Sequence, residues 1–82
     1  MSRILVYSRR GCHLCEILVD NLLTLVRGRA NVTICDIDSR EDWRQTYDVR
    51  VPAVELDGNI LCENTLDSEV ILTALLKLAE AE

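Results

Sequence analysis

The sequence predicts a single α/β domain in which helices cover both faces of a mixed sheet of four strands. The chain has 82 residues, which fits one domain spanning positions 1–82 and excludes a second. Hydrophobic residues make up 49% of it and charged residues 28%, which suits a globular core rather than a disordered chain. The hydrophobic pattern also switches between strand and helix periods in the order β-α-β-α-β-β-α.

The first half of the chain is expected to form a strand, a helix and a second strand. Arg3–Tyr7 is a short apolar run typical of a buried strand. From Cys12 to Arg27 apolar residues recur at helical spacing, and Gly28 follows as a C-terminal stop. Asn31–Asp38 alternates as a strand does, and the intervening helix makes it parallel to the first strand. The expected buried helix positions are Leu14, Ile17, Leu18, Leu22, Leu25 and Val26.

A short helix is expected next. Ser39 is followed three residues later by the acidic Asp42, a spacing typical of a helix start. Trp43 and Tyr47 are four residues apart and would share one face of this helix. Val51-Pro52 ends it, because proline cannot continue a helix.

A hairpin and a final helix complete the predicted fold. Asp57-Gly58 separates two short strands, Ala53–Leu56 and Asn59–Cys62, and this dipeptide is a strong hairpin signal. Asn64 or Thr65 is expected to cap the last helix. The expected buried positions of that helix are Leu66, Val70, Ile71, Ala74, Leu75 and Leu78.

Charge and hydropathy restrict the partners and the compartment. The formal net charge of −5 argues against a nucleic-acid partner. No apolar run approaches the roughly 20 residues that span a bilayer, so no membrane partner is expected. No secretory signal is visible, so we expect a cytoplasmic protein. We also expect the protein to act as a monomer. In such a reducing compartment, four cysteines point to redox catalysis or metal binding rather than to a disulfide scaffold.

The motif that carries chemistry is Cys12-His13-Leu14-Cys15, between the first strand and the first helix. Two cysteines at this spacing in such a context predict a redox pair, because one helical turn brings both sulfurs to one side. Cys12 at the helix N-terminus would be held as a thiolate by the backbone N–H groups, with its pKa lowered from about 8.5 to about 3.5–7.5. Cys15, one turn further in, is the natural resolving thiol. Gly11 permits the tight turn, and positive potential would come from Arg9, Arg10 and His13.

Two other interpretations of the cysteines remain open. In the first, Cys12 and Cys15 are a pair of inert buried side chains on the helix. In the second, the cysteines are part of a zinc site. The potential zinc ligands are Cys12, His13, Cys15, Cys35 and Cys62. The second Cys-x-x-Cys of a zinc knuckle is missing, so no metal is predicted. Cys35 and Cys62 are expected to be small strand residues.

The residues from Tyr7 to Cys15, together with Val51-Pro52 and Asp57-Gly58, resemble the glutaredoxin branch of the thioredoxin superfamily. More narrowly, they resemble small bacterial glutaredoxin-like proteins that carry a Ser-Arg-x-Gly-Cys-His-Leu-Cys segment. The resemblance covers essentially the whole chain in element order and implies the thioredoxin fold.

The resemblance also implies roles for individual residues. Cys12 would be the nucleophile, and Cys15 would resolve the mixed disulfide. Val51-Pro52 would be the cis-proline loop facing this pair, with the Val51 backbone paired to a substrate or to glutathione. Arg9 stands where glutaredoxins usually carry a lysine that contacts a glutathione carboxylate.

The chain departs from the glutaredoxin pattern in two places. His13-Leu14 replaces the usual Pro-Tyr between the cysteines, and Cys62-Glu63 replaces a glycine pair that lets glutathione lie against the backbone. Weak glutathione binding is therefore expected, with dithiol chemistry intact.

The expected activity is thiol–disulfide oxidoreduction without a bound cofactor. Its substrates would be protein or low-molecular-weight disulfides, and glutathione is one candidate reductant. The catalytic residues would be Cys12 and Cys15, and the substrate-binding residues are Arg9, Gly11, His13, Val51 and Pro52. The alternative is a non-catalytic module of the same fold that binds a metal or a protein partner through its cysteines.

Overall fold

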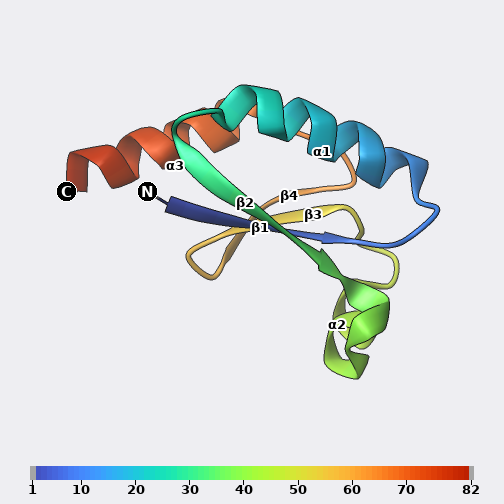
Figure 1. Cartoon of the computed structure of the whole chain (residues 1–82). Coiled ribbons are helices and arrows are strands. Elements are labelled where there is room, and N and C mark those ends of the chain that lie inside the picture. The colour runs from blue at the N-terminus through green and yellow to red at the C-terminus, as the bar shows by residue number, and fades with distance from the viewer. Residues whose placement is uncertain (1, 82) are drawn as a thin grey trace.

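A computed structural model describes residues 2–81 and has the predicted architecture (Figure 1). A mixed sheet of four strands carries helices on both faces, which confirms the predicted fold class. Within residues 2–81 no helix has the length and apolarity needed to cross a bilayer. In chain order the elements are β1 (Ser2–Ser8), α1 (His13–Val26), β2 (Ala30–Asp36), the 3-10 turn η1 (Ile37–Ser39), α2 (Glu41–Tyr47), β3 (Ala53–Leu56), β4 (Asn59–Glu63) and α3 (Ser68–Ala81).

The sheet has the strand order β2-β1-β3-β4. β1 is parallel to β2 and antiparallel to β3, and β3 is antiparallel to β4. The hairpin between β3 and β4 turns at Asp57 and Gly58, whose φ values are +51° and +84°. Positive φ at both central residues is what a two-residue hairpin turn requires, so this turn forms as predicted.

Each face of the sheet has its own core. α1 and α3 pack on one face, seen above the sheet in Figure 1, where Ile4, Leu22 and Ile71 are fully buried. α2 packs on the other face, against the end of the sheet where β1 and β2 finish. There the ring of Tyr7 stacks on that of Tyr47 with centroids 4.1 Å apart, and Trp43 meets Tyr7 edge-on. The two aromatic residues of α2 thus share one face, as predicted.

Some side chains predicted to be buried are exposed. The buried stripe of α1 runs through Cys15, Leu18, Leu22 and Val26. Leu14 and Ile17 are 53% and 45% exposed, because the 3.6-residue period turns both of them away from this stripe. Val70 is also 37% exposed on α3. The predicted buried set was therefore too wide.

Both predicted helix starts in the second half were wrong. η1 follows β2 directly, and the Ser39 hydroxyl donates to the Asp36 carbonyl instead of capping α2. α2 begins at Glu41 without a side-chain cap. α3 begins at Ser68, later than expected, and the Asp67 carboxylate accepts from the Val70 N–H at 3.3 Å. An aspartate is as good a cap as an asparagine or threonine, so composition alone does not select the position.

Candidate active site

A tight turn carries the first cysteine from the end of β1 to the start of α1. The N–H of Cys12 donates to the carbonyl of Arg9 at 3.3 Å, which closes the turn. Gly11 has a φ of +76°, a conformation that favours glycine. Nothing lies within 4 Å of the position that a Cβ would occupy there, so backbone conformation rather than space explains the glycine. The turn leaves Cys12 as the N-cap residue of α1.

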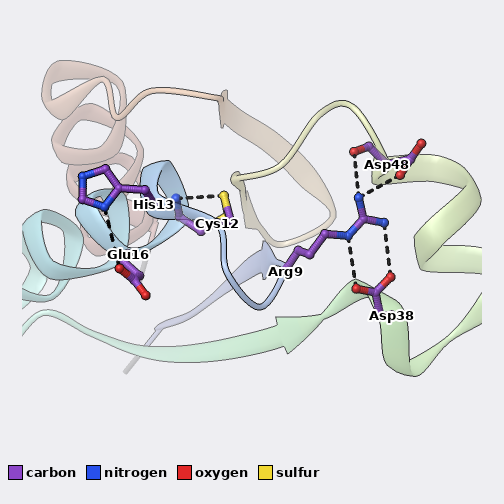
Figure 2. The surroundings of a disulfide bond; sticks show 7 residues. Arg9, Cys12, His13, Glu16, Asp38 and Asp48 are labelled. Atoms are coloured by element: carbon purple, nitrogen blue, oxygen red, sulfur yellow. Dashed lines mark hydrogen bonds and ion pairs between the residues drawn. A yellow bond between two sulfur atoms is a disulfide. The ribbon is translucent and has the colours of Figure 1, made fainter.

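Cys12 and Cys15 form a disulfide, with their Cα atoms 5.2 Å apart (Figure 2). The Cys12 Sγ accepts from the Cys15 N–H at 3.1 Å, in the manner of an N-cap side chain. Cys15 is only 3% exposed, whereas Cys12 is half-buried. Cys12 is therefore the more exposed cysteine of the pair, and its sulfur lies at the N-terminus of α1, where backbone N–H groups stabilise negative charge.

The Val51-Pro52 loop lies at the same end of the sheet as the disulfide. Tyr7 of β1 pairs with Ala53 of β3, so the residues after Tyr7 and before Ala53 leave the sheet together. The Val51–Pro52 peptide bond is cis. Pro52 is buried, and its carbonyl accepts from the Asn64 N–H at 2.7 Å, which joins this loop to the end of β4.

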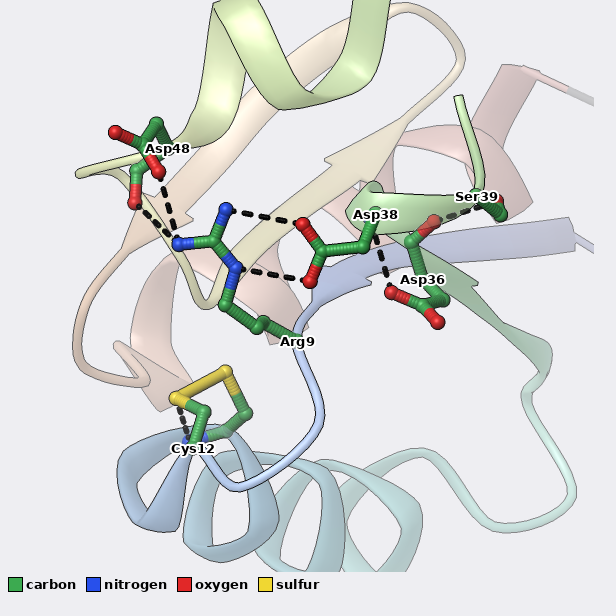
Figure 3. A network of polar contacts seen from close by, with 7 residues as sticks. Arg9, Cys12, Asp36, Asp38, Ser39 and Asp48 are labelled. Carbon is green, nitrogen blue, oxygen red and sulfur yellow. Dashed lines mark hydrogen bonds and ion pairs between the residues drawn. A yellow bond between two sulfur atoms is a disulfide. The ribbon is translucent and has the colours of Figure 1, made fainter. Parts of the chain in front are cut away.

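Arg9 is held by two carboxylates from other parts of the chain (Figure 3). Its Nε and Nη2 donate to the two Asp38 oxygens at 3.1 and 3.2 Å, and its Nη1 lies 2.8 Å from Asp48 Oδ1. Asp38 belongs to η1 and Asp48 follows α2, so Arg9 fastens the start of the cysteine turn to both. Arg9 is a predicted substrate-binding residue, and the structure shows its guanidinium paired with two carboxylates of the protein itself.

A second ion pair flanks the Val51-Pro52 loop. Arg50 pairs with Glu63 of β4, and its guanidinium lies 5.1 Å from the centre of the Tyr47 ring. Glu63, one of the two residues that stand in place of the glycine pair, thus has its charge balanced by Arg50. On the other side of the disulfide, exposed His13 has its Nδ1 3.8 Å from Glu16 Oε2. Asp38, Asp48 and Arg50 could not be predicted from the sequence, because each meets its partner only in the folded chain.

The remaining cysteines, Cys35 and Cys62, lie apart from the Cys12–Cys15 disulfide. Cys35 lies in the core beneath α2 and Cys62 in the core beneath α1 and α3, so the sheet separates them. Burial raises the pKa of both thiols. Among residues 2–81 no three His, Cys, Asp or Glu side chains converge as metal ligands. The potential zinc ligands are thus not brought together.

Residues 3–76 match the family described as glutaredoxin-like domain (DUF836), which accounts for most of the chain. The chain belongs to this family. No curated protein matches it. The glutaredoxin resemblance and the thioredoxin-like fold are therefore confirmed.

Solved structures share the fold of this glutaredoxin-like domain. One is a structural genomics target protein from X. campestris, with a TM-score of 0.70 and 24% identity over 90% of this chain and 96% of that one. Oxidized mitochondrial thioredoxin 3 from Saccharomyces cerevisiae gives a TM-score of 0.65 and 15% identity over 93% of this chain and 77% of that one. Oxidized glutaredoxin 2 from Chlamydomonas reinhardtii gives a TM-score of 0.59 and 22% identity over 99% of this chain and 85% of that one. At these identities the similarity shows the fold alone.

Proposed function

We propose that the protein is a dithiol–disulfide oxidoreductase in which Cys12 attacks the substrate and Cys15 resolves the intermediate. The observation that carries the proposal is the asymmetry of the pair. Cys12 is the more exposed residue and occupies the N-cap of α1, whereas Cys15 is buried one turn further along. Helix N-termini stabilise thiolates, and the thiolate is the nucleophile in disulfide exchange.

The reaction follows from this arrangement. In the reduced protein, the Cys12 thiolate attacks one sulfur of a substrate disulfide and forms a mixed disulfide, and the other substrate sulfur leaves as a thiolate and takes a proton from water. Cys15 then loses its proton to water and attacks the Cys12 sulfur, which releases the first substrate sulfur as a second thiolate. Two electrons pass to the substrate, and the Cys12–Cys15 disulfide forms.

Val51 is the proposed docking point for the substrate backbone. Within residues 2–81 neither its N–H nor its C=O makes a backbone hydrogen bond, and its side chain is only half-buried. An extended peptide can pair with such free groups as an added strand does. Gly11 leaves the approach to Cys12 open, and His13 lies exposed at its rim.

A trapping experiment tests this proposal. Without Cys15 the mixed disulfide cannot resolve, so Cys15→Ser, incubated with an oxidised protein substrate, should accumulate a covalent adduct at Cys12 that reductant releases. The matched control, Cys12→Ser, should form no adduct. If Cys12→Ser traps substrate as well as Cys15→Ser does, the assigned roles are wrong. If neither variant traps and the wild type retains one equivalent of zinc, the chain is a binding module.

A further inference from the structure

The charged side chains around the disulfide include more carboxylates than arginines. Figure 2 shows Arg9 with Asp38 and Asp48 on one side of Cys12 and His13 with Glu16 on the other. One arginine is thus shared by two carboxylates. His13 and Glu16 are both largely exposed, and the imidazole Nδ1 lies 3.8 Å from the carboxylate.

The other two arginines near the site, Arg10 and Arg50, do not reverse this excess of carboxylates over arginines. Arg50 is matched by Glu63. Arg10 makes no ion pair in the part of the chain that the structure describes, but it lines a surface hollow beside Cys15 together with three carboxylates. Those carboxylates belong to Glu16, Asp20 and Asp36. Around Cys12 the carboxylates therefore outnumber the arginines.

We infer that the Cys12–Cys15 pair acts on disulfides carried by cationic polypeptide segments and discriminates against small anionic disulfides such as glutathione disulfide. This inference rests on the proposed function and adds the charge of its substrate. Complementary charge accelerates encounter, and like charge slows it, mainly at low ionic strength. Arg9 and Arg50 are the cations best placed to offset this effect, but Asp38, Asp48 and Glu63 already hold them.

The test compares three synthetic peptides of equal length that carry the same disulfide flanked by lysine, serine or glutamate. The second-order rate constant for reduction by the reduced wild-type protein should fall in that order, with a spread of roughly tenfold at 20 mM salt. At 0.5 M salt the Debye length shrinks to a few ångströms, and the spread should collapse. Glutathione disulfide should react more slowly than the serine peptide.

A matched pair of variants locates the effect. Asp38→Asn removes one negative charge beside Cys12, so it should narrow the spread between the lysine and glutamate peptides. Asp57→Asn removes the same charge at the β3–β4 turn, at the opposite end of the sheet, and should leave the spread unchanged. Asparagine tolerates the left-handed conformation of that turn, so this control should fold normally.

The outcomes separate the two claims. Equal rates for the three wild-type reactions, or a faster reaction with the glutamate peptide, would overturn the inference and leave the oxidoreductase proposal standing. Reduction of none of the disulfides would overturn both. An unaltered spread in Asp38→Asn would show that the carboxylates around Arg9 do not set the preference.

Discussion

The clearest structural prediction concerns Cys12, which is the cap of α1 and the proposed nucleophile. Its Sγ accepts from the Cys15 N–H at 3.1 Å, and this N–H belongs to the first turn, where helical donors lack partners within the helix. Serine can replace that acceptor, but alanine cannot. Both Cys12→Ser and Cys12→Ala remove the disulfide and the nucleophile, so both should be inactive. They should differ in stability.

The expected difference follows from the value of a cap. Replacing a capping side chain with alanine typically costs about 1 kcal/mol of unfolding free energy. In a domain of this size, that loss lowers the melting temperature by roughly 4–8 °C. Urea unfolding of the two variants at pH 7, with reductant present, measures the difference directly, and Asp67→Ala against Asp67→Asn at α3 gives a reference for an ordinary cap. If Cys12→Ala is as stable as Cys12→Ser, the Cys12 sulfur is not a cap.

Three further predictions concern side chains around the site. Because Cys35 and Cys62 are buried and their pKa values are raised, iodoacetamide should modify Cys12 in the reduced native protein and reach these two thiols only on unfolding, as peptide mass mapping will show. The same raised pKa values predict that the unfolding free energy falls as the pH rises above about 8.5, because unfolded thiols then ionise before folded ones do; a flat profile between pH 8 and 10 would contradict this. Tyr7→Phe removes the 3.1 Å hydrogen bond to Glu55 and keeps the stacked ring, so urea unfolding should show a loss of about 1 kcal/mol, and a neutral result would mean that water replaces the bond fully.

Much of the fold could be predicted from sequence because its signals are local. Hydrophobic periodicity gave the order of the elements, and Asp57-Gly58 gave the hairpin and its turn conformation. The helix starts were harder, since Asp67, Asn64 and Thr65 are all good caps and tertiary packing decides among them. The exposure of Leu14 likewise depends on which stripe of α1 faces the sheet.

In the candidate site, too, features that depend on neighbouring residues could be predicted, and contacts between distant parts of the chain could not. The spacing of Cys12 and Cys15 within one turn is local, so the proximity of their sulfurs could be predicted. The partners of Arg9 could not, because Asp38 and Asp48 lie 29 and 39 positions further along the chain. The glutaredoxin resemblance implies that Arg9 contacts a carboxylate of glutathione. Only the fold shows that the protein supplies two carboxylates of its own.

A redox titration of the Cys12–Cys15 pair tests directly whether this disulfide takes part in catalysis or is structural. The protein is equilibrated in buffers of graded potential, and its thiols are trapped and counted by mass. We predict a single two-electron transition, assigned to this pair, with a midpoint between roughly −120 and −300 mV, the range of thiol–disulfide oxidoreductases. A disulfide that stays oxidised below about −300 mV would instead be a structural one, and the proposed catalytic cycle would then be wrong.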